Sequence, residues 1–264
     1  YYPETLEQAA AVYDFFKQSG KKYVTVGNGS NILAADSGFD GEVIDTKNLR
    51  KIERVSQNSF LCYAGTTVAR ILQYCKTHGF GGLEYLVGIP ASLGGLVYMN
   101  GGAGGKYICE NVKSVLIYDG EFKTLTNKSC LFGNKHSIMR DIDCLILAAE
   151  LNFTPKSSDE IAADTEYYLK KRRIQPIGKS CGCVFKNSGD LSAGKLIDEA
   201  GLKGLSIGGA TVSRDHANFI INTGTSSSDV YKLIQEVKRR VLEKTGILLE
   251  EEVVYIGDFN DTFG

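Results

Sequence analysis

Glycine is concentrated in a few segments of this chain, where it could bring backbone amides against a large anionic ligand. It makes up 30 of the 264 residues and clusters at 27–29, 79–82, 88–105 and 201–209. Clustered glycine indicates unusual backbone dihedrals or close approach to another surface. Successive N–H groups in such turns bind a pyrophosphate without side chains in the way. Ser30 and Asn31 add short polar groups after the first cluster, although residues 27–31 alone also fit a plain β-turn.

The glycine pattern differs from that of two common glycine-rich architectures. A solenoid spreads glycine at a fixed period, and the sequence has no such repeat. A dinucleotide-binding Rossmann turn needs a third glycine and a following helix, but residues 27–29 lead towards Asp36-Ser37-Gly38 instead. The pattern therefore favours a large ligand on a fold other than these two.

The thiols indicate a reducing compartment. The chain has seven cysteines, an odd number scattered through apolar contexts, which is typical of free thiols. Cys181 and Cys183 form C-x-C, which lacks the C-x-x-C spacing and the nearby histidine of a zinc site. We therefore predict no metal site.

Composition excludes several function classes. The 30 Lys and Arg residues balance 31 Asp and Glu, which argues against a nucleic-acid or anionic-membrane partner. Hydrophobic residues make up 43% and charged residues 23%, as in ordinary globular domains. The sequence lacks the roughly 20 consecutive apolar residues of a membrane span, and its start lacks the basic and apolar regions of a signal peptide. We expect a cytoplasmic protein.

Periodicity predicts short strands mixed with helices. Helical spacing is expected over 6–19, 68–78, 160–173, 194–199 and 228–245. Strands are expected at 23–26, 42–45, 52–55, 60–64, 112–118, 144–153, 183–186, 219–222 and 252–256, with a hairpin turn at Asp119-Gly120. Strict alternation of strand and helix is missing, so the pattern favours an α+β fold. Pro155 and the polar residues after it suggest a domain boundary.

Ordered motifs along nearly the whole chain resemble the UDP-N-acetylenolpyruvoylglucosamine reductase (MurB) family. Three motifs resemble the FAD-binding half of that family: V-G-N-G-S-N-I-L (26–33), A-G-T-T-V (64–68) and G-L-E-Y-L-V-G-I-P-A-S-L-G-G-L-V-Y-M-N-G-G-A-G-G (82–105). Five further motifs resemble its substrate half: R-R-I-Q-P (172–176), G-C-V-F-K-N (182–187), A-G-K-L-I-D-E-A-G-L-K-G (193–204), H-A-N-F-I-I-N (216–222) and L-E-E-E-V-V-Y-I-G (249–257). The region after Pro176 has no long inserted loop, so the shorter subtype is the better match.

The resemblance implies a fold, a reaction and cofactors. The fold would be a two-part FAD-binding domain of the vanillyl-alcohol-oxidase-like (PCMH-type) class, followed by an α+β substrate-binding domain. We expect FAD subdomains at 1–50 and 51–158, a substrate domain at 159–250, and a C-terminal strand segment at 251–264 that returns Glu252 to the active site. The family's T-x-F-x-I-G-G-like segment is missing, so the first subdomain is expected to lack its N-terminal part.

The implied reaction is reduction of UDP-N-acetylglucosamine enolpyruvate by NADPH through FAD, in peptidoglycan precursor synthesis. The alternative is a non-catalytic FAD- or nucleotide-binding relative with a decayed active site. We expect a monomer that acts on a small UDP-sugar. The motif positions imply these FAD-binding residues: Gly27, Asn28, Gly29, Ser30, Asn31, Gly88, Ile89, Pro90, Ser92, Gly94, Gly95, Asn100 and Gly102.

The implied catalytic positions differ from the family pattern at two of three sites. Cys183 stands where the family's proton-donating serine belongs, and a thiol can also donate a proton. Lys135 replaces the arginine of the family's Y-R-x-S-x-F, which keeps the positive charge but loses the planar fork that pairs with a carboxylate. Glu252 matches the family's catalytic glutamate.

The substrate carries a diphosphate, so cations and amides near the motifs are the implied substrate ligands. They are Lys186, Asn187, Lys195, His216 and Asn218. Each also has a plainer interpretation: a helix-surface lysine is commonly solvated, and a structural hydrogen-bonding histidine is at least as common as a ligand-binding one.

Overall fold

The computed structural model describes residues 1–187 and 191–259, so residues 260–264 of the predicted C-terminal segment lie outside the described residues. The described residues form two compact units. The N-terminal unit contains residues 1–29 and 41–172, and the C-terminal unit contains 30–40 together with the chain from Arg173 onward. Each unit mixes helices with antiparallel and parallel strands, as the α+β prediction requires.

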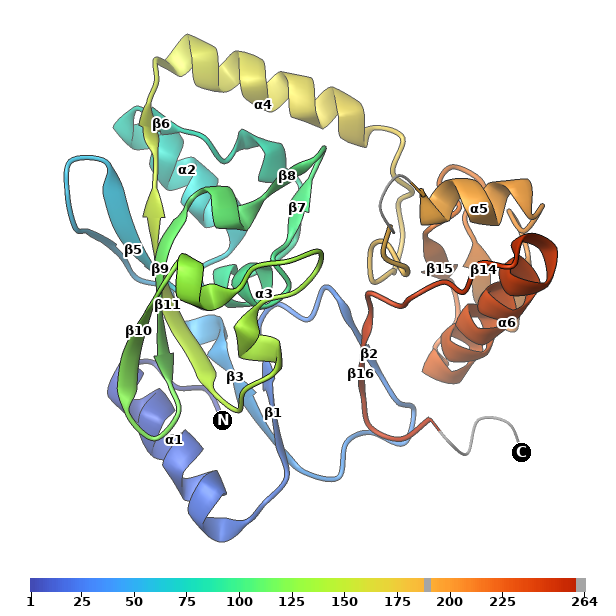
Figure 1. Cartoon of the computed structure of the whole chain (residues 1–264), viewed down its shortest axis with the longest axis horizontal. Coiled ribbons are helices and arrows are strands. Elements are labelled where there is room, and N and C mark those ends of the chain that lie inside the picture. Colours follow the sequence, from blue (N-terminus) through green and yellow to red (C-terminus); the bar gives the residue numbers. More distant parts are fainter. Residues whose placement is uncertain (188–190, 260–264) are drawn as a thin grey trace. The chain divides into compact units, whose positions relative to one another are not determined.

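A five-stranded antiparallel sheet is the centre of the N-terminal unit (Figure 1). Its strand order is β10-β9-β11-β5-β4, with bounds Phe122–Thr126, Val112–Tyr118, Leu145–Asn152, Ser59–Tyr63 and Ile52–Arg54. β9 and β10 form the hairpin predicted around Asp119-Gly120. Phe60, Ile117 and Leu151 are buried between this sheet and the helices on it.

The helices of this unit are α1 (Leu6–Ser19), α2 (Val68–His78), α3 (Leu93–Tyr98) and α4 (Ser158–Arg172). Two of them, α1 and α2, have the bounds that the sequence predicts, and α4 starts two residues earlier and ends one residue earlier than predicted. Thr5 and Thr67 cap the N-termini of α1 and α2, and Gly20 and Gly79 end them with a positive φ. Helix α3 was not expected, because its sequence lies inside a glycine-rich run.

Short elements complete the N-terminal unit. β1 (Tyr23–Val26) pairs in parallel with β3 (Glu42–Asp45). β6 (Phe80–Gly81) pairs with β12 (Thr154–Pro155), and β7 (Gly102–Ala103) pairs with β8 (Lys106–Tyr107). The 3₁₀ turns are η1 (Thr46–Asn48), η2 (Glu84–Leu86), η3 (Ile108–Glu110), η4 (Lys128–Cys130) and η5 (Ile138–Arg140).

The C-terminal unit packs two helices on short strands. Its elements are β2 (Ile32–Ala34), α5 (Ala193–Glu199), β13 (Ser206–Ile207), β14 (Ala210–Val212), β15 (Ile220–Asn222), α6 (Ser227–Thr245) and β16 (Val254–Ile256). β16 runs parallel to β2 and so brings residues 30–40 into this unit. The strand predicted at 183–186 is wrong as a continuous element, because the structure has only isolated bridges, Cys183 with Phe219 and Phe185 with Glu251.

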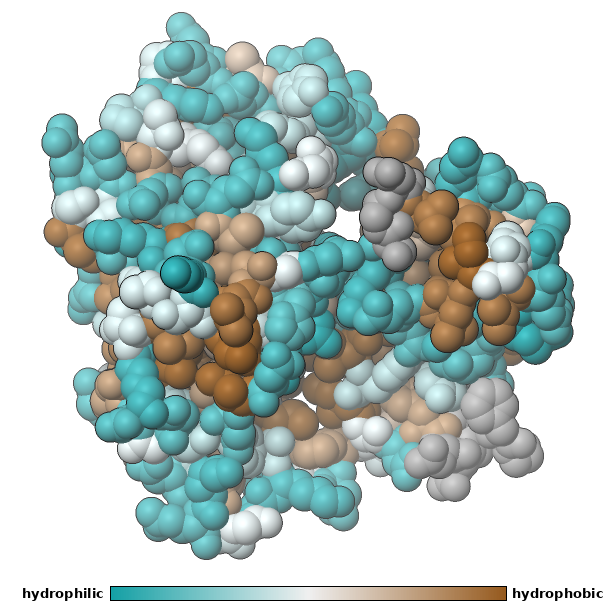
Figure 2. All heavy atoms as spheres, viewed as in Figure 1, coloured by the Kyte–Doolittle hydropathy of each residue, from teal (hydrophilic) through white to brown (hydrophobic). Residues whose placement is uncertain are grey.

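Apolar side chains are concentrated in three buried clusters, and hydrophilic side chains cover most of the face seen in Figure 2. Within residues 1–187 and 191–259, every helix is too short or too polar to cross a bilayer.

Asp36 joins the 30–40 segment to the first turn of α6. Its carboxylate accepts hydrogen bonds from Ser226 Oγ (2.8 Å), from Ser227 N (2.7 Å) and Oγ (2.8 Å), and from Ser228 N (3.1 Å). The bond from the Ser227 amide, followed by those of the serine hydroxyls, lowers the pKa of Asp36 well below its usual value. A carboxylate at a helix N-terminus also interacts favourably with the helix dipole.

We expect Asp36→Asn to lower the free energy of unfolding by up to about 1 kcal/mol at pH 7, as for loss of a negative charge at a helix N-terminus. Because the folded-state pKa of Asp36 is lowered, its stabilisation is full above the unfolded-state pKa near 4 and fades as pH falls below that value. Urea unfolding at several pH values measures this, with Asp40→Asn as a control in the same exposed segment. An equal loss at pH 7 and at pH 3 would contradict the assignment.

Candidate active site

The structure brings the first glycine cluster against the second. Asn28 Nδ2 donates a hydrogen bond to Pro90 O (2.7 Å), and a Cβ on Gly27 would overlap Ser92 Oγ. Ser92 is the N-cap of α3 and accepts from Gly95 N (3.4 Å). Segments 27–29 and 88–95 therefore meet through backbone and short side chains, as a nucleotide-binding surface requires.

The remaining glycines of this surface are constrained in different ways. Gly94 lies against Ala64, so that a Cβ would approach Ala64 Cβ to 3.0 Å. Gly102 pairs closely with the backbone of Lys106, and Gly88 has a φ of +77°. Asn28, Gly29, Gly88, Pro90 and Gly95 are exposed, so backbone from two segments is open to a ligand. These residues fit a large phosphate-containing cofactor such as FAD, because glycine backbone without covering side chains can approach its phosphates closely.

Asn100 connects the glycine-rich run to the turn that carries Lys135. It is 4% exposed and has a φ of +42°. Its side-chain amide donates to Gly133 O (2.9 Å) and accepts from Cys109 N (3.3 Å). Its amide is thus committed to backbone partners.

Lys135 lies half-buried in a strained turn. Its φ is +53°, a left-handed conformation that costs a non-glycine residue about 1–2 kcal/mol. Gly133 and His136 close the turn with a backbone bridge, and Arg140 Nη1 donates to Lys135 O (2.7 Å). The Arg140 guanidinium also lies 5.5 Å from the Tyr98 ring centroid. Such strain persists where the surroundings hold it and is concentrated at functional sites.

Cys183 and Glu252 belong to neighbouring segments of the C-terminal unit. Glu252 N donates to Val184 O (2.7 Å), and Val184 N donates to Asn218 O (2.9 Å). Asn31 Nδ2 donates to Glu252 O (3.0 Å), while Val254 N donates to Asn31 O (3.0 Å). Both Cys183 and Glu252 are half-buried. That the C-terminal segment returns Glu252 to an active site remains a prediction.

Cys181 differs from Cys183 in its surroundings. Its thiol donates to Ile32 O (3.2 Å), and burial raises the pKa of Cys181 to about 11. The Cys181 thiol is thus engaged with the backbone of β2, and the role of Cys183 as proton donor remains a prediction.

The five predicted substrate ligands lie in the same unit but have very different surroundings. Asn218 is 3% exposed and forms two hydrogen bonds to the Phe185 backbone, from Phe185 N (2.9 Å) and to Phe185 O (2.8 Å). Asn187 Oδ1 accepts from Ala193 N (3.0 Å) at the start of α5. The amide of Asn218 fixes the Cys183 segment, which is a structural task, and its contact with a substrate remains a prediction.

The lysines and the histidine of this set are also placed differently from one another. Lys186 forms an ion pair with Glu250, and the Lys195 side chain is 74% exposed near Glu199 (3.7 Å). His216 packs edge-on against Phe219 at 4.9 Å between ring centroids. Burial lowers the pKa of His216, so its ring is neutral at neutral pH. Lys195 is the member most available to a ligand.

Sequence reasoning missed Glu84. This carboxylate is 5% exposed in η2, directly before the 88–95 segment. Its signal was a charged residue inside the apolar run Leu83-Glu84-Tyr85-Leu86-Val87.

Comparison with known proteins decides the family. Residues 1–126 match the family model for an FAD binding domain, and residues 174–256 match that for the UDP-N-acetylenolpyruvoylglucosamine reductase C-terminal domain. The UDP-N-acetylenolpyruvoylglucosamine reductase of Chlamydia felis is 38% identical over 250 residues, which cover 94% of this chain and 84% of that protein. The chain belongs to the UDP-N-acetylenolpyruvoylglucosamine reductase family.

Other members of the reductase family agree. That of Limosilactobacillus reuteri is 39% identical over 97% of this chain and 87% of its own length. The crystal structure of the Thermus caldophilus member matches with a TM-score of 0.83 at 32% identity, over 97% of this chain and 91% of that one. The predicted family and the predicted fold class, an FAD-binding domain of PCMH type with a C-terminal α+β domain, are confirmed.

Proposed function

We propose that the protein catalyses the FAD-dependent reduction of UDP-N-acetylglucosamine enolpyruvate to UDP-N-acetylmuramate with NADPH, a step of peptidoglycan precursor synthesis. Membership of the reductase family across both domains is the observation that carries the proposal. The alternative, a non-catalytic relative, finds no support among the similar proteins, whose names are those of the reductase. We further propose that the protein is a cytoplasmic monomer.

When bound, FAD supplies a hydride relay between NADPH and the substrate. Residues 27–29, 88–95 and 100–102 would hold it, chiefly through the exposed Asn28, Gly29, Gly88, Pro90 and Gly95, and Ser30 and Asn31 would add polar groups. Amide N–H groups would compensate the pyrophosphate charge, and the glycines would permit close approach of the backbone. The protein's part is to bind, to orient and to exclude water.

Cys183, Lys135 and Glu252 would act on the enolpyruvyl group. Hydride addition to its methylene carbon leaves an enolate, which needs charge stabilisation and a proton at the adjacent carbon. The Cys183 thiol would donate that proton. Lys135 and Glu252 would act at the substrate carboxylate, where the Lys135 ammonium offsets negative charge. Lys186, Asn187, Lys195, His216 and Asn218 would bind the UDP-sugar or shape its site.

Flavin binding is the first requirement of this proposal. The purified protein, incubated with FAD and desalted, is expected to be yellow and to lose its visible flavin absorbance when NADPH is added anaerobically. NADPH should reduce the flavin faster than NADH at equal concentration. A protein that stays colourless after FAD incubation would exclude the reductase, and faster reduction by NADH would overturn the cofactor preference.

A further inference from the structure

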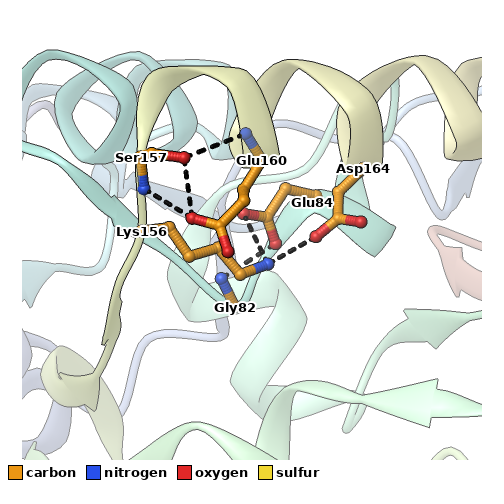
Figure 3. A network of polar contacts seen from close by, with 6 residues as sticks. All are labelled: Gly82, Glu84, Lys156, Ser157, Glu160 and Asp164. Carbon is orange, nitrogen blue, oxygen red and sulfur yellow. Dashed lines mark hydrogen bonds and ion pairs between the residues drawn. The ribbon is translucent and has the colours of Figure 1, made fainter.

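Glu84 is a buried carboxylate next to the flavin-binding segment. Its side chain is 6% exposed, and Oε2 accepts a hydrogen bond from Gly82 N (2.8 Å). Oε1 lies 3.4 Å from Lys156 Nζ (Figure 3). Val87 N donates to Glu84 O (3.0 Å) and Ile89 N to Leu86 O (3.0 Å), so the turn held by Glu84 continues directly into Gly88-Ile89-Pro90.

Lys156 connects Glu84 to helix α4. It follows β12, and its own amide donates to Gly79 O (2.9 Å). Its ammonium also lies 2.5 Å from Asp164 Oδ2, and its side chain is 22% exposed. Burial lowers the pKa of Lys156, but the bonds to Asp164 and Glu84 outweigh this and raise the pKa above its usual value. The ammonium therefore stays charged at neutral pH.

One face of α4 lies along the glycine-rich segments. Asp164, Tyr168 and Arg172 are spaced four residues apart and so share a helix face. The Tyr168 ring lies 6.5 Å from that of Tyr85, and the Arg172 side chain lies against Gly88, 3.3 Å from where a Cβ would stand. Together with the Lys156–Asp164 ion pair, these contacts place α4 along residues 84–88.

A gain in folding stability does not by itself explain the Glu84–Lys156 ion pair. A buried ion pair loses about as much hydration energy as it gains from attraction, so apolar residues of similar size often serve as well or better. A charged network does, however, favour one geometry, because either group without the other is costly to bury.

We propose that Glu84, through its ion pair with Lys156, is a positioning residue that holds residues 88–90 in the conformation that binds FAD. The inference rests on the proposed function, because it assumes that these residues contact the flavin. Holding the loop before the cofactor binds removes an ordering cost from binding, so its loss weakens affinity for FAD without changing any group that touches it.

The test compares Glu84→Gln, Lys156→Met and the double variant. Glutamine keeps the volume of Glu84 and an oxygen for Gly82 N, but it removes the charge. Each single variant is expected to raise the Kd for FAD about tenfold, measured by quenching of flavin fluorescence. In the double variant the thermal stability of the apoprotein should recover, because neither charge is left buried alone, while FAD affinity stays low.

Glu150→Gln is the matched control. Glu150 is also a little-exposed carboxylate paired with a lysine, at 2.9 Å from Lys113 Nζ, but it lies in β11. Its Kd for FAD should equal that of the parent. If Glu84→Gln also binds FAD as tightly as the parent, the inference is overturned while the proposed function stands. A parent that binds no FAD refutes the proposed function instead.

A variant at Asp164 decides the case in which Glu84→Gln does not fold. Asp164 is 46% exposed, so Asp164→Asn should fold normally while removing one of the two partners of Lys156. A rise of about threefold in the Kd for FAD supports the inference. An unchanged Kd in both this variant and Lys156→Met overturns it.

Discussion

Cys183→Ala is expected to slow reoxidation of the reduced enzyme by its enolpyruvyl substrate by about 10²–10⁴-fold, the usual range for losing a positioned acid. Flavin reduction by NADPH should be unchanged, because that hydride transfer uses no proton donor at this position. Stopped-flow absorbance of the flavin follows the two half-reactions separately. If the alanine variant is reoxidised as fast as the parent, the Cys183 thiol is not the proton donor and the acid is another group.

Cys183→Ser supplies the control. Its hydroxyl stands in nearly the same place and is the group that the family resemblance implies at this position, so substantial activity should remain. A cysteine thiol ordinarily ionises near pH 8.5, whereas a serine hydroxyl stays protonated throughout the working range. Activity of the parent should therefore decline at a lower pH than activity of the serine variant. Identical pH profiles would argue against a thiol donor.

Lys135→Ala has the second large expected effect. It should lower kcat/KM for the enolpyruvyl substrate by about 10²–10³-fold, comparable to removing one donor from a charge-stabilising site. Lys135→Arg should retain or raise activity, because the guanidinium pairs with a carboxylate through two parallel bonds. Steady-state kinetics with varied substrate concentration measures both variants.

The strained turn makes this prediction specific to Lys135. The backbone of Lys135 is held by Arg140 and by the Asn100–Gly133 bond, so replacing its side chain leaves the turn's other contacts in place. Lys128→Ala, in η4 of the same unit, is the matched control and should behave as the parent. An unchanged kcat/KM in Lys135→Ala would exclude a role for this ammonium at the substrate.

Much of the fold could be predicted because local patterns decide it. Apolar spacing and the capping pairs Thr5 with Gly20 and Thr67 with Gly79 define α1 and α2. Helix α3 was missed because glycine has a low helix propensity, yet the Ser92 cap and burial of Leu93 and Leu96 stabilise it here. In α3, the packing of buried leucines outweighs the low helix propensity of the glycines.

Local sequence patterns could not predict which strands pair when they lie far apart in the chain. β2 pairs with β16 more than 200 residues later, so residues 30–40 belong to the C-terminal unit although they follow the first glycine cluster. The segment 183–186 has strand composition, but it carries only single bridges to 219 and 251. Motif resemblance identified candidate residues. It could not indicate that the Asn218 side-chain amide hydrogen-bonds to the Phe185 backbone or that Glu84 is buried.

Product formation tests the central claim most directly. The purified protein, loaded with FAD, would be mixed with NADPH and UDP-N-acetylglucosamine enolpyruvate, and the products separated and weighed by mass spectrometry. The account predicts that, in the absence of oxygen, NADPH is oxidised beyond one equivalent per bound flavin only when the enolpyruvyl substrate is present. It also predicts that the product carries two additional hydrogens, as UDP-N-acetylmuramate does. Recovery of unchanged substrate from a flavin-loaded enzyme that NADPH reduces would contradict it.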